Sequence, residues 1–120
     1  MEVKLQDAEL KVMDVLWRRG TVSAKQIYQT LKEKYGYSRS ATYTLIGRCI
    51  NKQAIERIEP GFLCRALMTR EETQQLETRE LIDKLYDGSA DRLVASILGK
   101  PDLSADEIQR LRKIVEEWED

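Results

Sequence analysis

The chain has 120 residues, of which 42% are hydrophobic and 34% charged, and its formal net charge is −1. This length allows one or two small domains, and the composition is typical of a soluble, helix-rich protein. No apolar run approaches the roughly 18–20 residues that span a bilayer, and no signal-peptide pattern follows Met1. We therefore expect a cytoplasmic protein that does not insert into a membrane.

The small net charge conceals two halves of opposite sign. Residues 1–68 contain 12 Lys and Arg against 7 Asp and Glu, whereas residues 69–120 contain 8 against 14. Such an asymmetry indicates one part that faces nucleic acid and another part with a different partner. Chance clustering of charges on solvated surfaces is the alternative.

Two helices are predicted in the first 36 residues. The first is amphipathic, contains Leu10, Met13 and Leu16, and stops near Gly20. A capping box at Ser23–Gln26 starts the second helix, and Gly36 ends it, because glycine is common just after the last helical turn. Ser38 then caps a third helix after a very short turn, which is the layout of a helix-turn-helix.

The third helix, residues 38–52, has two contrasting faces. One face carries Leu45, Ile46, Cys49 and Ile50. The opposite face carries small hydrogen-bonding residues with an aromatic residue and a cation at its borders: Ser40, Tyr43, Thr44, Gly47, Arg48 and Asn51. This composition is typical of a helix that reads a DNA groove.

A β-hairpin is predicted directly after this helix. Two short alternating segments, residues 55–59 and 62–67, flank a Pro60–Gly61 turn. A single hairpin is not stable alone in water, so it must pack on the helices as the wing of a winged helix. Arg57 and Arg65 are then either phosphate contacts or solvated strand residues.

The second half is predicted to be helical throughout. Capping boxes begin at Thr69 and Ser104, and Ser89 caps a short helix between them. The predicted fold is mainly α, with a winged-helix DNA-binding domain over residues 1–68 and a three-helix dimerisation domain over residues 69–120. These short helices bury little by themselves, so a second copy is the expected source of burial; folding back on the first domain is the alternative. The residues predicted at the dimer interface are Leu85, Leu93, Ile97, Ile108, Leu111, Val115 and Trp118.

The chain resembles the penicillinase and methicillin-resistance repressors, a family that also includes the copper-operon repressors. The similar segments occur in order along nearly the whole chain: Leu5–Leu10, Val12–Trp17, Thr42–Arg48, Asp83–Gly88 and Leu103–Ile108 followed by Leu111. The resemblance implies a homodimeric transcriptional repressor that binds a palindromic, double-stranded DNA operator, and a resistance or stress operon is the expected target. Two recognition helices would read half-sites about one helical turn apart or a multiple of it.

The resemblance also suggests how such repressors are inactivated. In the resistance branch, a membrane sensor triggers proteolysis at an Asn-Phe bond, and the collinear residues here are Ser96 and Ile97. The copper branch uses cysteines near the C-terminus, but this chain has no cysteine after Cys64 and no histidine. The sequence therefore argues against copper sensing by that route, and the substituted bond argues against the usual cleavage.

Other departures concern the DNA-facing residues. The wing is entered through Gln53–Ala54 where relatives commonly have Lys-Gly, and Phe62 replaces a basic residue after the wing glycine. Ala66 replaces a tyrosine near the end of the second wing strand. We expect these changes to preserve the fold and to alter the operator sequence that is read.

The residue pattern and the resemblance together assign the DNA-binding side chains. Arg39 and Ser40 are expected to meet phosphate in the first turn of the recognition helix, and Tyr43 and Thr44 to reach base edges. Gly47 would allow close approach to the backbone of the duplex. The complete set of expected DNA contacts is Arg39, Ser40, Ala41, Tyr43, Thr44, Gly47, Arg48, Asn51, Arg57 and Arg65.

No pattern in the chain favours catalysis, a metal or a cofactor. There is no histidine, no phosphate-binding glycine loop and no metal-ligand cluster in the sequence. Cys49 and Cys64 are expected to be a reduced, buried pair, with a disulfide as the alternative. The main competing function is a winged-helix module that binds protein and not DNA.

Overall fold

A computed structural model describes residues 4–99 and 102–117. The chain divides into two compact units, Met1–Glu77 and Thr78–Asp120, and the division falls inside the fourth helix. None of the helices in the described ranges is both long and apolar enough to cross a membrane.

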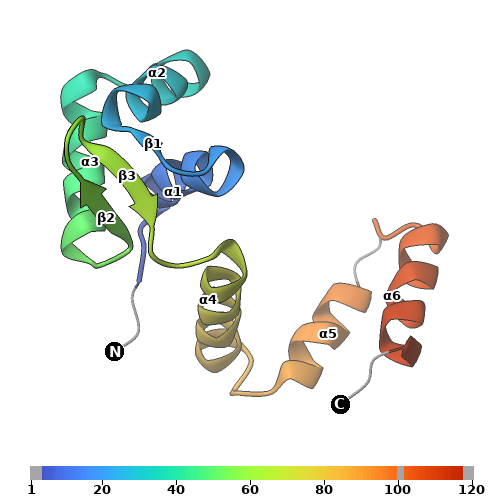
Figure 1. Cartoon of the computed structure of the whole chain (residues 1–120). Helices are drawn as coiled ribbons and strands as arrows, with labels where there is room; N and C mark the ends of the chain where they lie inside the picture. Colours follow the sequence, from blue (N-terminus) through green and yellow to red (C-terminus); the bar gives the residue numbers. More distant parts are fainter. Residues whose placement is uncertain (1–3, 100–101, 118–120) are drawn as a thin grey trace. The chain divides into compact units, whose positions relative to one another are not determined.

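The first unit is a three-helix bundle with a small sheet (Figure 1). Its helices are α1 (Asp7–Arg19), α2 (Ala24–Tyr35) and α3 (Arg39–Asn51). Its strands are β1 (Val22–Ser23), β2 (Ile55–Ile58) and β3 (Leu63–Ala66). This arrangement confirms the predicted mainly helical winged-helix fold.

The predicted helix starts and ends are confirmed. Ser23 Oγ accepts from the backbone N–H of Gln26 at 3.1 Å, and Gln26 Oε1 accepts in return from the N–H of Ser23. Gly36 ends α2 in the left-handed region, and Ser38 Oγ accepts from the N–H of Ala41 to start α3. Local sequence signals therefore determined the helix-turn-helix.

The sheet contains a third strand that the hairpin prediction lacked. Strand β3 lies in the middle, with β2 and β1 antiparallel on its two sides, and Val22 is opposite Cys64. A two-residue strand leaves no periodic pattern in a sequence, so its pairing with β3 could only come from tertiary contacts. Strand β1 joins the end of β3 that follows the hairpin turn, at Leu63 and Cys64, to the start of α2.

The core lies between the three helices and the inner face of the sheet. It contains Met13, Ile27, Leu31, Ile46 and Ile55, all fully buried. The helical spacing of α2 places Tyr35 on the same stripe as Ile27 and Leu31, but its ring is exposed and lies under the ammonium groups of Lys11 and Lys34. The amphipathic character of tyrosine permits this position at the edge of a core.

The turn from α3 into the wing closes without the usual glycine. Gln53 adopts a left-handed backbone with φ of 62°, and the N–H of Ala54 donates to the carbonyl of Cys49 at 2.9 Å. Ala54 is fully buried, and its carbonyl accepts from the N–H of Leu67. The substituted Gln53–Ala54 pair therefore still directs the chain from α3 into β2.

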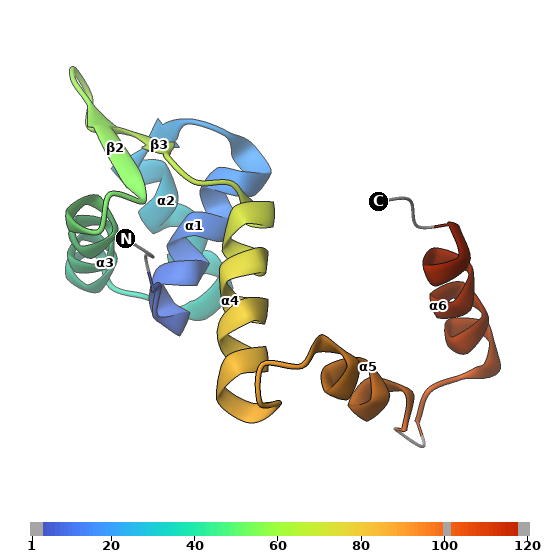
Figure 2. The same ribbon diagram turned by 90° about the horizontal axis from the view of Figure 1, so that it is seen from below.

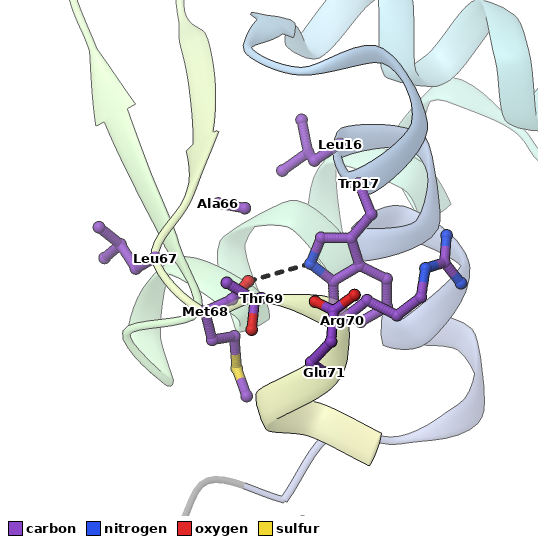
Figure 3. A pocket seen from close by; sticks show the side chains of 8 residues that line it. All are labelled: Leu16, Trp17, Ala66, Leu67, Met68, Thr69, Arg70 and Glu71. Carbon is purple, nitrogen blue, oxygen red and sulfur yellow. Dashed lines mark hydrogen bonds between the residues drawn. The ribbon is translucent and has the colours of Figure 1, made fainter. Parts of the chain in front are cut away.

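The start of helix α4 (Arg70–Leu85) is fixed to α1 within the first unit. Trp17 Nε1 donates to the carbonyl of Met68 at 3.0 Å (Figure 3). The Arg70 guanidinium lies over the indole and 2.8 Å from Asp14 Oδ1. Trp17, Met68 and Arg70 line part of an open pocket of about 410 Å³. Since these polar groups already have partners, the pocket walls serve to anchor α4.

The second unit contains the remainder of α4 with α5 (Ala90–Leu98) and α6 (Ala105–Glu117). Ser89 caps α5, and Ser104 and Glu107 form the predicted capping box of α6. No described residue from 78 onward is buried. These helices therefore display apolar side chains without a core of their own.

Candidate nucleic-acid interface

Helix α3 presents the two faces expected from its sequence. Leu45, Ile46 and Cys49 are buried, and Ile50 is half-buried. The exposed residues are Arg39, Ser40, Ala41, Thr44, Arg48 and Asn51, with Tyr43 and Gly47 half-buried between them. One continuous face of α3 therefore carries all eight predicted contacts of the recognition helix.

The polar residues on this face are available for a partner. In the part of the chain that the structure describes, Ser40, Thr44 and Asn51 make no side-chain hydrogen bond. Arg48 likewise has no ion pair with a described carboxylate. Arg48 is exposed, so its guanidinium can reach solvent on this face.

The inner anchoring of α3 includes one residue that the sequence reading overlooked. Thr42 is fully buried, and its hydroxyl donates to the carbonyl of Ser38 at 2.9 Å. This bond satisfies a polar group that would otherwise be costly to bury. The only sequence signal of its inward orientation is its position on the helix, on the side of Leu45, Ile46 and Cys49.

The C-terminal end of α3 is held by an ion pair whose carboxylate is buried and whose lysine is half-buried. Lys52 Nζ lies 2.6 Å from Glu9 Oε1 and donates to the carbonyl of Lys4 at 2.8 Å. Burial alone would raise the pKa of Glu9, but hydrogen bonds from Gln6 and Lys52 and the charges of Lys52 and Arg48 lower it below its ordinary value. Glu9 is therefore ionised at neutral pH and fixes α3 to α1.

The wing arginines lie on opposite faces of the hairpin. Arg57 is opposite the buried Cys64 in the β2–β3 register, whereas Arg65 is opposite Glu56. Residues paired across two strands share a face, so Arg57 is on the side of the helices and Arg65 on the outer side. Figure 2 shows the hairpin extending beyond the helices of the first unit.

Each wing arginine is also paired with a carboxylate. Arg57 Nε lies 2.7 Å from Glu59 Oε1, and Arg65 forms an ion pair with Glu56. The Arg57 pair holds the pKa of Glu59 below its ordinary value. Each wing arginine is therefore neutralised by a neighbouring carboxylate, whereas Arg48 on α3 makes no ion pair with a described carboxylate.

Aromatic contacts connect the wing to α3. The rings of Tyr43 and Phe62 are 5.8 Å apart at an interplanar angle of 85°, which is an edge-to-face contact. The guanidinium of Arg39 lies 5.0 Å from the Tyr43 ring centre, and that of Arg57 lies 3.6 Å from the Phe62 ring centre. The sequence showed Phe62 only as a replacement for the basic residue common in the family, and it did not predict this contact.

Both cysteines are free and buried in the first unit. Burial raises the pKa of Cys49 to about 12, with the Glu9 charge as a further cause, and burial raises that of Cys64 to about 11. Among the described residues there is also no cluster of three or more metal-ligating side chains. The chemistry of this face is that of hydrogen bonding and charge.

The predicted dimer residues lie exposed or half-buried on α4–α6. Leu85 is 66% and Val115 71% exposed, while Leu93 and Leu111 are half-buried. Ile97 and Ile108 are exposed as well, and Trp118 falls outside the described residues. Ser96 lies inside α5, where its Oγ accepts from the Tyr86 hydroxyl at 3.1 Å, so the Ser96–Ile97 bond is within a helix.

Comparison with known proteins gives a consistent result over the whole described chain. Residues 5–117 match the model of the family described as penicillinase repressor. The methicillin resistance regulatory protein MecI of Mammaliicoccus sciuri is 30% identical over 114 residues, which cover 93% of each chain. The penicillinase repressors of Bacillus licheniformis and Staphylococcus aureus are 25% and 27% identical, with 95% of this chain covered in each case.

Proposed function

The chain belongs to the penicillinase repressor family of transcriptional repressors, and we propose that it represses by binding a palindromic DNA operator as a homodimer. The observation that carries this proposal is the outward face of α3. It combines small groove-compatible residues with an Arg48 that has no ion-pair partner among the described residues. The names of the relatives point to a resistance operon as the regulated target.

In this proposal different residues of α3 contact the phosphates and the groove of the duplex. Arg39, Ser40 and Ala41 form the first turn, where exposed side chains and backbone N–H groups meet phosphate. Thr44, Arg48 and Asn51 face the groove, where they reach base edges or the adjacent phosphates. Gly47 lets the helix axis approach the duplex closely because it has no side chain to exclude it.

The wing makes a smaller electrostatic contribution in this proposal. Arg57 lies on the side of the helices and approaches a phosphate if its pair with Glu59 opens. Arg65 would have to bind phosphate from the outer side, where Glu56 already neutralises it. Sequence-independent affinity would then come mainly from α3 and the rest of the first unit.

The homodimer rests on the apolar residues of the second unit. Val94, Ile97, Ile108, Ile114 and Val115 are all exposed. If the same residues of a second copy cover them, apolar surface is removed from water. This burial contributes a favourable free energy of about 25 cal/mol per Å². A two-fold dimer would also double the recognised sequence, since one recognition helix contacts only a few base pairs.

Relief of repression by a membrane sensor and protease would face a structural barrier. The Ser96–Ile97 bond lies inside α5, so a protease would reach it only after local opening of that helix. The substitution of the bond and its helical setting together make this chain a poor substrate for the cleavage known in the resistance branch.

An electrophoretic shift assay on DNA from upstream of the protein's own gene tests the proposal. Binding should fall steeply between about 50 and 200 mM salt, because DNA binding releases counterions. The double variant Thr44→Ala, Arg48→Ala should lose at least about tenfold in affinity. A protein-binding module would show no affinity for this DNA and no such salt response.

A matched control distinguishes recognition from a general loss of charge. Arg19 and Thr30 are bonded to each other on α1 and α2, away from the exposed face of α3. The double variant Arg19→Ala, Thr30→Ala removes the same residue types and should keep operator affinity within about twofold. Equal losses in the two double variants would refute the assignment of Thr44 and Arg48.

A further inference from the structure

Phe62, at the tip of the wing, has an unusual backbone conformation. Its φ is +49°, in the left-handed region that bulky side chains rarely adopt. Glycine would be the ordinary choice at such a position. A phenylalanine that persists there needs a compensating contact, and outliers of this kind are enriched at functional sites.

Three contacts meet at this one residue. Its ring packs edge-to-face on Tyr43 of the recognition helix at 5.8 Å. The Arg57 guanidinium lies on the ring at 3.6 Å while it is paired with Glu59. The Phe62 carbonyl accepts from the N–H of Ala24 at 3.0 Å, in the first turn of α2.

We propose that Phe62 is a positioning residue for operator recognition, which locks the wing onto the recognition helix through Tyr43 and aims Arg57. This inference rests on the proposed function. We call the pair Tyr43 and Phe62 the aromatic bridge. It joins the two cations that border it, Arg39 on α3 and Arg57 on β2, in one packed row.

The bridge matters because it joins the turn of the wing to the recognition helix, whereas the pairing with β1 joins the wing to the start of α2. Strands β2 and β3 have four residues each, and the turn at residues 59–62 lies beyond their last paired residues. A hairpin that reorients on binding must lose conformational freedom in the complex, whereas a wing already fixed to α3 does not. The bridge therefore favours binding to a duplex that fits α3 and the wing together.

The bridge also changes the role of Tyr43. Its ring contacts the Phe62 ring edge-to-face and lies under the Arg39 guanidinium, and the residue is half-buried. Its ring acts mainly through packing. The variant Tyr43→Phe should therefore retain operator affinity within about twofold, whereas Tyr43→Ala should lose about three- to tenfold, the range for an aromatic pair.

The variant Phe62→Gly provides the direct test. Glycine suits the left-handed backbone, so this substitution removes the ring without adding strain at the turn. The probe is the duplex that the wild-type protein enriches from a random pool, with a scrambled duplex of the same composition for comparison. Affinity for the enriched duplex should fall about three- to tenfold and affinity for the scrambled duplex should stay within about twofold.

Two further variants separate positioning from folding. Phe62→Tyr keeps the ring and should restore affinity for the enriched duplex, and Leu67→Ala, an exposed residue after β3, should leave it unchanged. Adding Tyr43→Ala to Phe62→Gly should cost less than the product of the two single losses, because both remove the same contact. Amide exchange in β2 and β3 should accelerate in Phe62→Gly and not in Leu67→Ala.

The possible results are distinguishable. Unchanged affinity of Phe62→Gly for the enriched duplex, or equal losses on both duplexes, would overturn the role of Phe62 while leaving the repressor function in place. Failure of the wild-type protein to enrich any duplex would overturn the proposed function, and the positioning role with it. Unchanged amide exchange in Phe62→Gly would show that the bridge does not lock the wing.

Discussion

Glu9 is the one charged side chain that is buried within the described ranges, with 1% of its surface exposed. It joins the start of α1 to the end of the recognition helix through Lys52. Charged residues are rarely buried unless they are paired, and breaking such a pair leaves an uncompensated charge. The orientation of α3 therefore depends on an ion pair between residues 43 positions apart.

The Glu9–Lys52 pair predicts a specific pH dependence of stability. Since the folded-state pKa of Glu9 is lowered, its contribution is complete above the unfolded value near 4.5 and is lost as the pH falls through the folded value. Glu9→Gln should lower the free energy of unfolding by about 2–3 kcal/mol at about pH 7, and the difference should shrink below about pH 4. Denaturant unfolding at both pH values measures this.

A surface pair provides the control for this prediction. Arg18 and Asp14 lie one helical turn apart on α1, and the arginine is largely exposed. Arg18→Gln should change the unfolding free energy by less than about 1 kcal/mol, as is usual for surface ion pairs. A pH-independent loss in Glu9→Gln would contradict the electrostatic explanation and indicate altered packing instead.

The two thiols should be unreactive in the folded protein. Thiolate is the reactive form, and the pKa values of about 12 for Cys49 and about 11 for Cys64 leave almost none at about pH 8. We expect iodoacetamide to modify both cysteines only as fast as the first unit unfolds, as followed by mass spectrometry with and without denaturant. Rapid labelling of the native protein would instead favour a redox role.

At the scale of elements, helix α3 has a well-defined N-cap but a residue of low helix propensity in its interior. Ser38 caps it, but Gly47 lies in its interior, where glycine costs about 1 kcal/mol relative to alanine. A Cβ placed at Gly47 would have no neighbouring atom within 4 Å. Packing in the folded protein therefore gives no reason for a glycine at this position.

Gly47→Ala should separate stability from function. The free energy of unfolding should rise by about 0.5–1 kcal/mol, while operator affinity should fall because the methyl group faces the duplex. Thermal unfolding and the shift assay measure the two effects. A stabilised variant with full affinity would argue against close approach of α3 at this residue.

Gly36→Ala is the matched comparison. Gly36 ends α2 with φ of 75°, which alanine adopts only with strain. The same substitution should here lower the unfolding free energy by about 1 kcal/mol. If the free energy of unfolding rises in Gly47→Ala and falls in Gly36→Ala, the stability of the fold explains the glycine at position 36 but not the one at position 47.

At the scale of the whole molecule, the first unit has a buried core and the second has none among its described residues. The exposed apolar residues of α5 and α6 need a cover, and a stable homodimer interface typically buries about 800 Å² or more on each partner. The excess of acidic residues after residue 68 gives this part of the chain a negative net charge, which disfavours contact with other polyanions.

Disruption of these apolar faces should produce monomers. Sedimentation of the double variant Ile97→Asp, Val115→Asp should show the mass of one chain, whereas Gln75→Asp, Gln109→Asp, at exposed polar positions, should remain dimeric. Loss of the dimer should also weaken binding to a palindromic duplex far more than binding to one half-site. An unchanged dimer would exclude these helices as the interface.

The sequence by itself determined the elements and their order. Capping residues, terminal glycines and apolar spacing act within a few positions of each other, so Ser23, Gly36, Ser38 and Ser104 marked helix boundaries correctly. The same local spacing separated the buried side of α3 from its exposed side. The division into domains at residues 68 and 69 remains a prediction beside the two compact units of the structure.

Only the tertiary structure decided which of these residues meet. The neutralisation of Arg65 by Glu56, the anchoring of Lys52 by Glu9 and the contact of Phe62 with Tyr43 all join separate elements. Such contacts depend on strand register and on how helices pack, and neither leaves a periodic signal in one sequence. For this reason the sequence could predict a recognition helix, whereas only the fold shows how the wing is held against it.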